Sequence, residues 1–113
     1  MTSTKNALIT GGAGFIGSAL AHRLIDDGWS IKVLDNLATG RKENIEDLLS
    51  HDNFEFVEHT VTDRSVLESM IEWCDQCYHL AAPVGVKYIM DNPVLTILDN
   101  IRGIDAVLEL CNK

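Results

Sequence analysis

The sequence predicts an α/β fold, in which a parallel sheet is covered by helices on both faces. Short apolar runs alternate with segments of helical spacing along the whole chain, and this alternation is typical of parallel sheets. A glycine-rich stretch also follows the first apolar run and opens the first helical segment, as in proteins that bind phosphate between a strand and a helix. The 113 residues are enough for about one domain.

The first half of the chain predicts three strands and two helices. Gly28 follows the last apolar position of the first helical segment, where helices often end. In the second, short helix we expect Ile45, Leu48 and Leu49 to pack inward. In chain order, the elements are a strand over 6–10, a helix over 14–27, a strand over 30–35, a helix over 42–50 and a strand over 54–57.

The second half predicts two helices around a fourth strand. Thr62 and Asp63 precede the first of these helices as its N-cap, and the strand covers 76–81. Asn92 and Pro93 open the last helix, which runs to about Cys111. Its apolar stripe is wider than packing on one face of a sheet requires. The stripe contains Val94, Ile97, Leu98, Ile101, Ile104, Leu108 and Leu110.

The glycine-rich stretch predicts a binding site for a dinucleotide. Gly12-x-Gly14-x-x-Gly17 and Gly11-x-x-Gly14-x-x-Gly17 both fit dinucleotide patterns, which need a strand before, a helix after and an acidic residue at the end of the second strand. Asp35 closes that strand. A carboxylate there would accept hydrogen bonds from ribose hydroxyls and repel the 2′-phosphate of NADP, which favours NAD. The alternative is a glycine-rich turn without a ligand.

Composition excludes several functions. The net charge is −8, with 17 acidic and 9 basic residues, which argues against a nucleic-acid partner. No apolar run is long enough to span a membrane, and we expect no signal peptide. Three cysteines, an odd number, favour a reduced, cytoplasmic protein.

Cys74 and Cys77 form a C-x-x-C pattern with Asp75 between them. A redox pair or half of a zinc site would use this spacing. The acidic neighbour does not suit a reactive thiol, and there is no second C-x-x-C. We therefore favour ordinary buried cysteines, with a thiol redox module as the remaining alternative, and expect no metal site.

The motifs and their order resemble the N-terminal half of the extended short-chain dehydrogenase/reductases. The matching stretches are 10–17, Asp35-Asn36-Leu37, Tyr78-His79-Leu80-Ala81-Ala82, Asn92-Pro93 and Asn100-Ile101-Arg102-Gly103. Within that family the chain is most similar to the NAD-dependent nucleotide-sugar epimerases, dehydratases and decarboxylases. Residues 82–88 look most like those of UDP-glucuronate decarboxylases and UDP-sugar epimerases. The resemblance implies a Rossmann-type NAD-binding domain over 1–113, truncated after about four strands.

The resemblance also implies a role for each matching residue. The pyrophosphate would lie on the glycine motif, the adenosine ribose on the end of the second strand, adenine beside the third, and nicotinamide beside the fourth. Asn100 would match the family asparagine, although from the sequence it is equally an exposed helix residue. In that order, the cofactor-binding residues are Gly11, Gly14, Phe15, Ile16 and Gly17, then Asp35 and Asn36, then Thr60 and Val61, then Leu80, Ala81 and Ala82, and finally Asn100.

Two departures from the family matter. The family usually has Asp where this chain has Thr60, and threonine is a poorer acceptor, so the resemblance implies weaker binding of adenine. The family's catalytic Tyr-x-x-x-Lys pair is missing from the 113 residues, since Tyr78 is followed four positions later by Ala82 and Tyr88 by Asn92. We therefore expect no catalytic residue in this chain.

Two functions remain open. The chain is either the NAD-binding half of an enzyme acting on a UDP-sugar, or a short dinucleotide-binding or assembly protein without activity. In both cases we expect association into a homodimer or oligomer through the helix over 93–111 and the exposed edge of the fourth strand.

Overall fold

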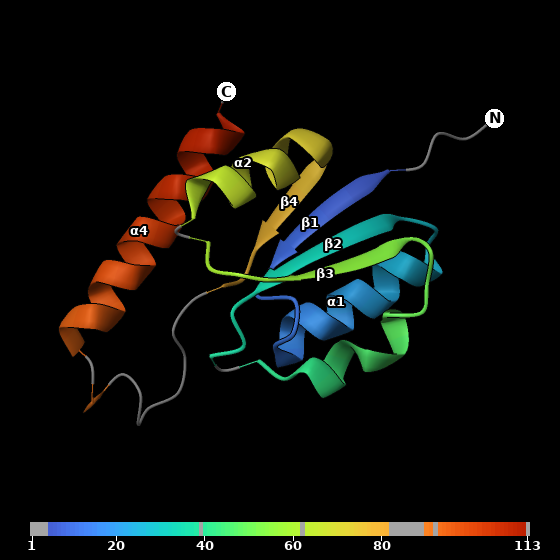
Figure 1. Ribbon diagram of the computed structural model, residues 1–113, viewed down its shortest axis with the longest axis horizontal. Coiled ribbons are helices and arrows are strands. Elements are labelled where there is room, and N and C mark those ends of the chain that lie inside the picture. Colours follow the sequence, from blue (N-terminus) through green and yellow to red (C-terminus); the bar gives the residue numbers. More distant parts are fainter. Residues whose placement is uncertain (1–4, 39, 62, 82–89, 92, 113) are drawn as a thin grey trace.

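The structure, a computed structural model, contains four parallel strands with helices on both faces of the sheet (Figure 1). It describes residues 5–38, 40–61, 63–81, 90–91 and 93–112. The elements are β1 (Asn6–Thr10), α1 (Phe15–Asp26), β2 (Ser30–Asp35), the 3₁₀ helix η1 (Lys42–Leu48), β3 (Phe54–Glu58), α2 (Arg64–Trp73), β4 (Gln76–His79) and α4 (Pro93–Cys111). The predicted fold and the order of its elements are confirmed.

The strands lie in the order β3-β2-β1-β4. The chain therefore builds outward from β1 to β3 and then returns to place β4 on the other side of β1. In open parallel sheets, ligands bind at such a reversal, beyond the carboxyl ends of the strands. Here that place lies after Thr10 and His79, which are paired in the register of β1 and β4.

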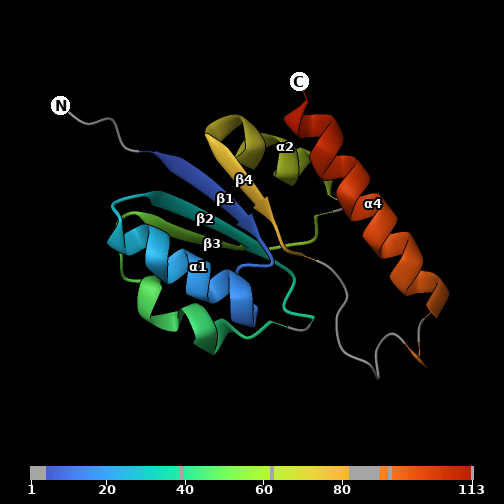
Figure 2. The same ribbon diagram turned by 180° about the vertical axis from the view of Figure 1, so that it is seen from behind.

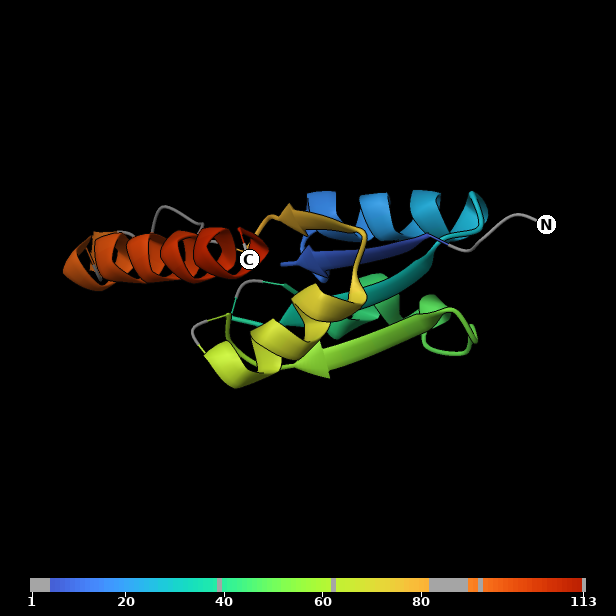
Figure 3. The same ribbon diagram turned by 90° about the horizontal axis from the view of Figure 1, so that it is seen from above.

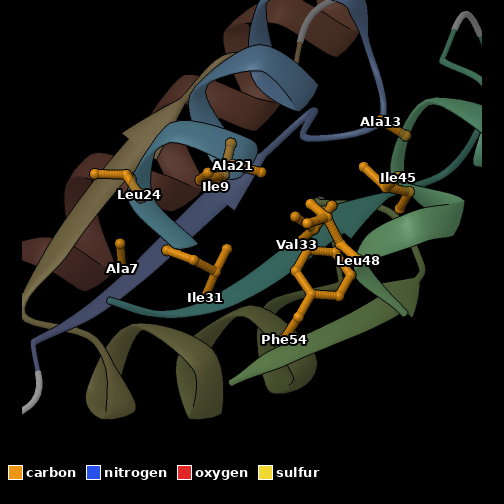
Figure 4. Packing of buried hydrophobic residues seen from close by; sticks show 10 residues of the cluster. All are labelled: Ala7, Ile9, Ala13, Ala21, Leu24, Ile31, Val33, Ile45, Leu48 and Phe54. Carbon is orange, nitrogen blue, oxygen red and sulfur yellow. The ribbon is translucent and has the colours of Figure 1, made fainter. Parts of the chain in front are cut away.

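One face of the sheet packs against α1 and η1 (Figures 2 and 4). Alternate residues of a strand point to the same face, and the small and branched side chains of β1 and β2 follow this rule. The buried cluster on this face contains Ala7, Ile9, Ala13, Ala21, Leu24, Ile31, Val33, Ile45, Leu48 and Phe54. It fixes the position of α1 against the strand that precedes it.

The other face packs against α2 and the C-terminal part of α4, so α1 and α2 lie on opposite sides of the sheet (Figure 3). Leu8 and Leu34 supply the strand side chains of this cluster, and Leu67 and Met70 supply those of α2. From α4 the cluster takes Ala106, Val107 and Leu110. The two clusters together make the three-layer arrangement that the sequence predicts.

The residue that ends α1 and the residue that caps α2 were predicted correctly. Gly28 follows α1 with φ +89°, a conformation that glycine adopts at little cost. Asp63 caps α2 by accepting from the backbone N–H groups of Ser65 and Val66. Thr62 and Asn92 lie outside the described residues.

Two details of the prediction are wrong. Leu49 is 40% exposed, because a 3₁₀ helix has three residues per turn and aligns Ile45 with Leu48 instead. β4 ends at His79, not at residue 81. Beyond this end the Leu80 N–H donates to the Thr10 carbonyl at 3.0 Å. The N–H groups of Leu80 and Ala81 also donate to the Thr10 hydroxyl, at 3.1 and 3.2 Å.

The outer face of α4 is uncovered. Figure 3 shows the helix extending past the carboxyl ends of the strands, and its buried hydrophobic residues all lie in its C-terminal part. The exposed large side chains are Val94, Leu95, Ile97, Leu98, Ile101, Ile104 and Leu108. The sequence prediction of a stripe wider than the sheet needs is thus confirmed. No helix in the described part of the chain has both the length and the apolar character of a membrane span.

Candidate functional site

The turn after β1 is held against the end of β4. Gly11 has φ +73°, and its N–H donates to the Leu34 carbonyl at 2.8 Å. A Cβ at this position would lie 2.7 Å from the Ala81 nitrogen, which is closer than atoms approach. Glycine is therefore required here both by the backbone angle and by the contact with the backbone that follows β4. The structure thus brings together two regions that the sequence predicted as one site.

Gly17 and Gly14 differ in what surrounds them. A Cβ on Gly17 would lie 2.3 Å from the Gly11 carbonyl oxygen, so α1 packs directly on the backbone of the turn. A Cβ on Gly14 would meet one atom within 4 Å, the same oxygen at 3.3 Å. The space beside Gly14 is otherwise open, which leaves room for a ligand to approach the backbone.

The N-terminus of α1 is suited to an anion. Gly14 is the N-cap residue, no side chain caps the helix, and its first turn contains no acidic residue. The first helical hydrogen bond runs from the Ser18 N–H to the Gly14 carbonyl at 2.9 Å, so the N–H groups of Phe15, Ile16 and Gly17 have no intrahelical acceptor. Phe15 is 90% and Ile16 70% exposed. These donors and the helix dipole favour a phosphate group.

Asp35 joins the turn to β2. Its buried carboxylate accepts from the Ala13 N–H at 2.9 Å and from the Leu37 N–H at 2.8 Å. An ionised carboxylate has about four acceptor positions. Two backbone donors therefore leave capacity for the ribose hydroxyls that the sequence analysis assigned to it.

Two residues that support this carboxylate were not predicted as site residues. Gly40 lies against Asp35, because a Cβ there would be 2.9 Å from its Oδ2. The Asn44 side chain donates to the Ala13 carbonyl at 2.8 Å. Both close the loop after β2 over the turn. Gly40 and Asn44 follow Asp35 by five and nine positions, and their contacts with the turn are visible only in three dimensions.

Thr10 is a further residue that the sequence analysis left without a role. Its buried hydroxyl accepts from the N–H groups of Leu80 and Ala81 and lies 2.7 Å from the His79 Nδ1. With two donors on its oxygen, the hydroxyl donates its own hydrogen to Nδ1, which places the ring hydrogen of a neutral His79 on Nε2. Burial lowers the pKa of His79 and agrees with a neutral ring. His79 is therefore a packed residue whose Nδ1 is engaged by Thr10.

The other residues that were predicted to bind the cofactor lie at several separate places outside the glycine turn. Asn36 is exposed, and its side chain accepts from the Ala38 N–H at 3.0 Å. Val61 packs on the α2 and α4 side of the sheet, 3.2 Å from where a Cβ on Gly103 would lie. Thr60 is half-buried, and Leu80 is exposed at the end of β4. Ala82 lies outside the described residues.

Asn100 lies on α4 and is half-buried, so it is not the exposed helix residue that the sequence left as one alternative. Its side chain forms no hydrogen bond with the described residues. The structure does not bring Asn100 or Val61 into contact with the glycine turn in the way that it does Ala81. Their roles toward a cofactor stay predictions.

The cysteines do not form a reactive pair. All three are free thiols. Burial raises the pKa of Cys74, and raises that of Cys77 to about 12. A reactive thiol needs a lowered pKa, so the thiol redox alternative loses support. Among the described residues, no three His, Cys, Asp or Glu side chains come together to hold a metal ion.

Alanine at Gly17 and at Gly14 should separate folding from binding. Gly17→Ala forces a methyl group onto the Gly11 carbonyl, and we expect it to lower the free energy of unfolding by at least about 2 kcal/mol. Gly14→Ala brings its methyl group to 3.3 Å from the Gly11 carbonyl oxygen, in otherwise open space, and should cost about 1 kcal/mol. Urea unfolding measures both. Equal losses at the two positions would contradict the geometry of the turn.

Stability should depend on pH through His79. Its pKa is lower in the folded chain than the ordinary value near 6.5, so below about pH 6.5 the unfolded chain binds more protons and folding weakens. Between pH 7.5 and 5.5 the free energy of unfolding should therefore fall more in the wild type than in His79→Asn, which keeps an acceptor for Thr10. Parallel pH profiles would show that burial of His79 has no such effect.

Comparison with known proteins agrees with this geometry. The family model for GDP-mannose 4,6 dehydratase matches residues 8–113. The chain is 42% identical over 109 residues to UDP-glucuronic acid decarboxylase 1 of Danio rerio, covering 96% of this chain and 25% of that protein. It therefore spans about a quarter of the length of this curated relative.

Two solved structures are similar over nearly the whole chain. An epimerase from Methanothermobacter thermautotrophicus has a TM-score of 0.86 and 37% identity, over 96% of this chain and 32% of that one. UDP-glucose 4-epimerase from Thermus thermophilus, solved in complex with NAD, has a TM-score of 0.78 and 35% identity, over 94% and 33%. The chain belongs to the GDP-mannose 4,6-dehydratase family and corresponds to the N-terminal portion of its nucleotide-sugar epimerases, dehydratases and decarboxylases.

Proposed function

We propose that residues 1–113 are the NAD-binding portion of an enzyme that acts on a UDP-sugar by transient oxidation. The observation that carries this proposal is the uncapped N-terminus of α1, lined by glycine and placed beside the Asp35 carboxylate. The relatives named above, a UDP-glucuronic acid decarboxylase and a UDP-glucose 4-epimerase with NAD, support the cofactor and the substrate class.

The described residues fit a dinucleotide in three parts. The N–H groups of Phe15, Ile16 and Gly17 would hold the diphosphate, next to the open space at Gly14. The free acceptor positions of Asp35 would receive the adenosine ribose hydroxyls, and its charge would repel the extra phosphate of NADP. Leu80 and Ala81, at the end of β4, would border the nicotinamide. NAD supplies the capacity to take up and return a hydride.

This chain would bind without catalysis on its own. The 113 residues contain no Tyr-x-x-x-Lys pair, and His79 is half-buried with its Nδ1 engaged by Thr10. A proton-transfer group must reach the substrate, and these residues do not provide one. The three free cysteines favour a reducing compartment, and we place the protein in the cytoplasm on that basis.

The exposed face of α4 supports the alternative role in assembly. Val94, Ile97, Ile101, Ile104 and Leu108 recur at spacings of three and four and are all exposed. This spacing puts them on one side of a helix, and apolar patches of this kind mark interaction sites. We propose that a second copy of the chain covers this face. The role in assembly and the NAD-binding role are compatible.

Calorimetric titration tests the NAD-binding role. The wild-type chain should release heat with NAD and bind NADP more weakly. Gly14→Ala should bind NAD roughly tenfold more weakly or worse, because its methyl group fills the space that the diphosphate needs, while its melting temperature stays close to that of the wild type. Absence of heat at millimolar NAD would refute the proposal, and tighter binding of NADP would refute the role of Asp35.

Sedimentation velocity tests the assembly role. Wild-type protein should sediment as a dimer or larger species, and Ile101→Gln should shift it toward the monomer by placing a polar group in the apolar face. Arg102→Gln is a matched control on the same helix and should leave the distribution unchanged. A monodisperse wild-type monomer would contradict the proposed interface.

A further inference from the structure

Leu37 has a backbone conformation that leucine rarely adopts. It lies two residues after the end of β2, and its φ is +61°. Among the described residues it is the only one other than glycine with a positive φ. In this left-handed region the Cβ atom comes too close to the following carbonyl oxygen, so a bulky side chain there marks a strained position. Such strain persists only where the surrounding structure holds it, and it is concentrated at functional sites.

Two contacts hold Leu37 in this conformation. Its half-buried side chain packs against the hydrophobic cluster that the sheet forms with α1 and η1. Its backbone N–H donates to Oδ1 of Asp35 at 2.8 Å. The next N–H, that of Ala38, donates in the same way to the Asn36 side chain at 3.0 Å, so two successive side chains accept from the backbone two residues further on. The loop therefore turns back on the end of β2, with the Leu37 N–H directed at the carboxylate.

The hydrogen bond from Leu37 completes the support of the Asp35 carboxylate. Oδ2 accepts from the Ala13 N–H at 2.9 Å and lies beside Gly40. A carboxylate held at one oxygen can still turn about its Cβ–Cγ bond, whereas hydrogen bonds to both oxygens fix its plane. One of these bonds comes from the turn between β1 and α1, and the other comes from the strained residue of the loop. The charge and the free acceptor positions of Asp35 therefore have one fixed direction.

We propose that Leu37 is a positioning residue, whose left-handed backbone fixes the Asp35 carboxylate and thereby sets the preference of the site for NAD over NADP. The inference rests on the NAD-binding role proposed above. A carboxylate with a fixed plane presents its acceptors to the ribose hydroxyls of NAD and cannot turn its charge away from the 2′-phosphate of NADP. Packing of the Leu37 side chain offsets the strain that this direction requires. Leu37 itself needs no contact with the cofactor.

Leu37→Ile separates the backbone angle from the size of the side chain. Isoleucine has the same atoms as leucine, but its branched Cβ disfavours a positive φ. We expect the NAD affinity of this variant to fall roughly tenfold, as for the loss of one hydrogen bond to a charged group, while its NADP affinity changes less. The ratio of the two affinities, measured by calorimetric titration with each dinucleotide, should therefore fall.

Leu37→Gly and Leu37→Asn are the matched controls. Glycine and asparagine both adopt a positive φ readily and both keep the N–H group, so the ratio of the NAD and NADP affinities should stay within about twofold of the wild-type ratio. Both variants lose apolar packing, so their melting temperatures should fall. A structural role alone would make the affinity ratio follow the melting temperature. A loss of preference in the controls equal to that in Leu37→Ile, or an unchanged preference in Leu37→Ile, would overturn the proposal.

The ligand-free wild-type chain provides a test that needs neither a variant nor NAD. Backbone carbon chemical shifts measured by NMR should report a positive φ at Leu37. A negative φ there would overturn this inference and leave the NAD-binding role standing. A wild-type chain with a positive φ at Leu37 that binds no NAD would instead refute the proposed function, and with it the preference that Leu37 serves.

Discussion

The backbone of the turn between β1 and α1 touches other parts of the chain so closely that side chains are excluded. At Gly17 the helix lies on the Gly11 carbonyl, and at Gly11 the turn lies on the backbone that follows β4. These two contacts fix the first turn of α1 relative to two strands at once. Everything else at the candidate site is arranged around that rigid point, including the open space beside Gly14.

Polar groups then lock the turn in place without using up its donors. Asp35 accepts from Ala13 and Leu37, and Thr10 accepts from the residues after β4. Buried polar groups need such partners, and the bonds of Ala13, Leu80 and Ala81 each join the end of a strand to a segment distant in the sequence. The N–H groups at the start of α1 are left out of this network. The contacts that stabilise the sheet thus leave these N–H groups without intrahelical acceptors, at the place where we propose that the diphosphate binds.

Sequence reasoning succeeded where the signal was local. Asp63 before α2 and Gly28 after α1 act within a few residues of their own positions, so pattern and chemistry were sufficient. The position of Asp35 at the end of β2 followed from the same reading. The hydrogen bond that Asp35 accepts from Ala13 could not be predicted in this way, because the two residues are 22 positions apart in the chain.

The errors and omissions came from contacts between distant segments. Leu49 was assigned to the core because an α-helical spacing was assumed where the chain forms a 3₁₀ helix. Thr10 was quoted as part of a motif, but its hydroxyl acts on Leu80 and Ala81, which lie on a different strand. That Val61 also packs near Gly103 of α4 was a further contact that the sequence did not indicate, and its role beside adenine stays a prediction. None of these could be derived from spacing alone.

The central claim is that the N-terminus of α1 binds the diphosphate of NAD. Amide chemical shifts of the chain, followed by NMR during addition of NAD, test it most directly. The account predicts the largest changes at the N–H groups of Phe15, Ile16 and Gly17, with further changes at the end of β2. Saturable changes elsewhere that leave these amides unmoved would contradict it.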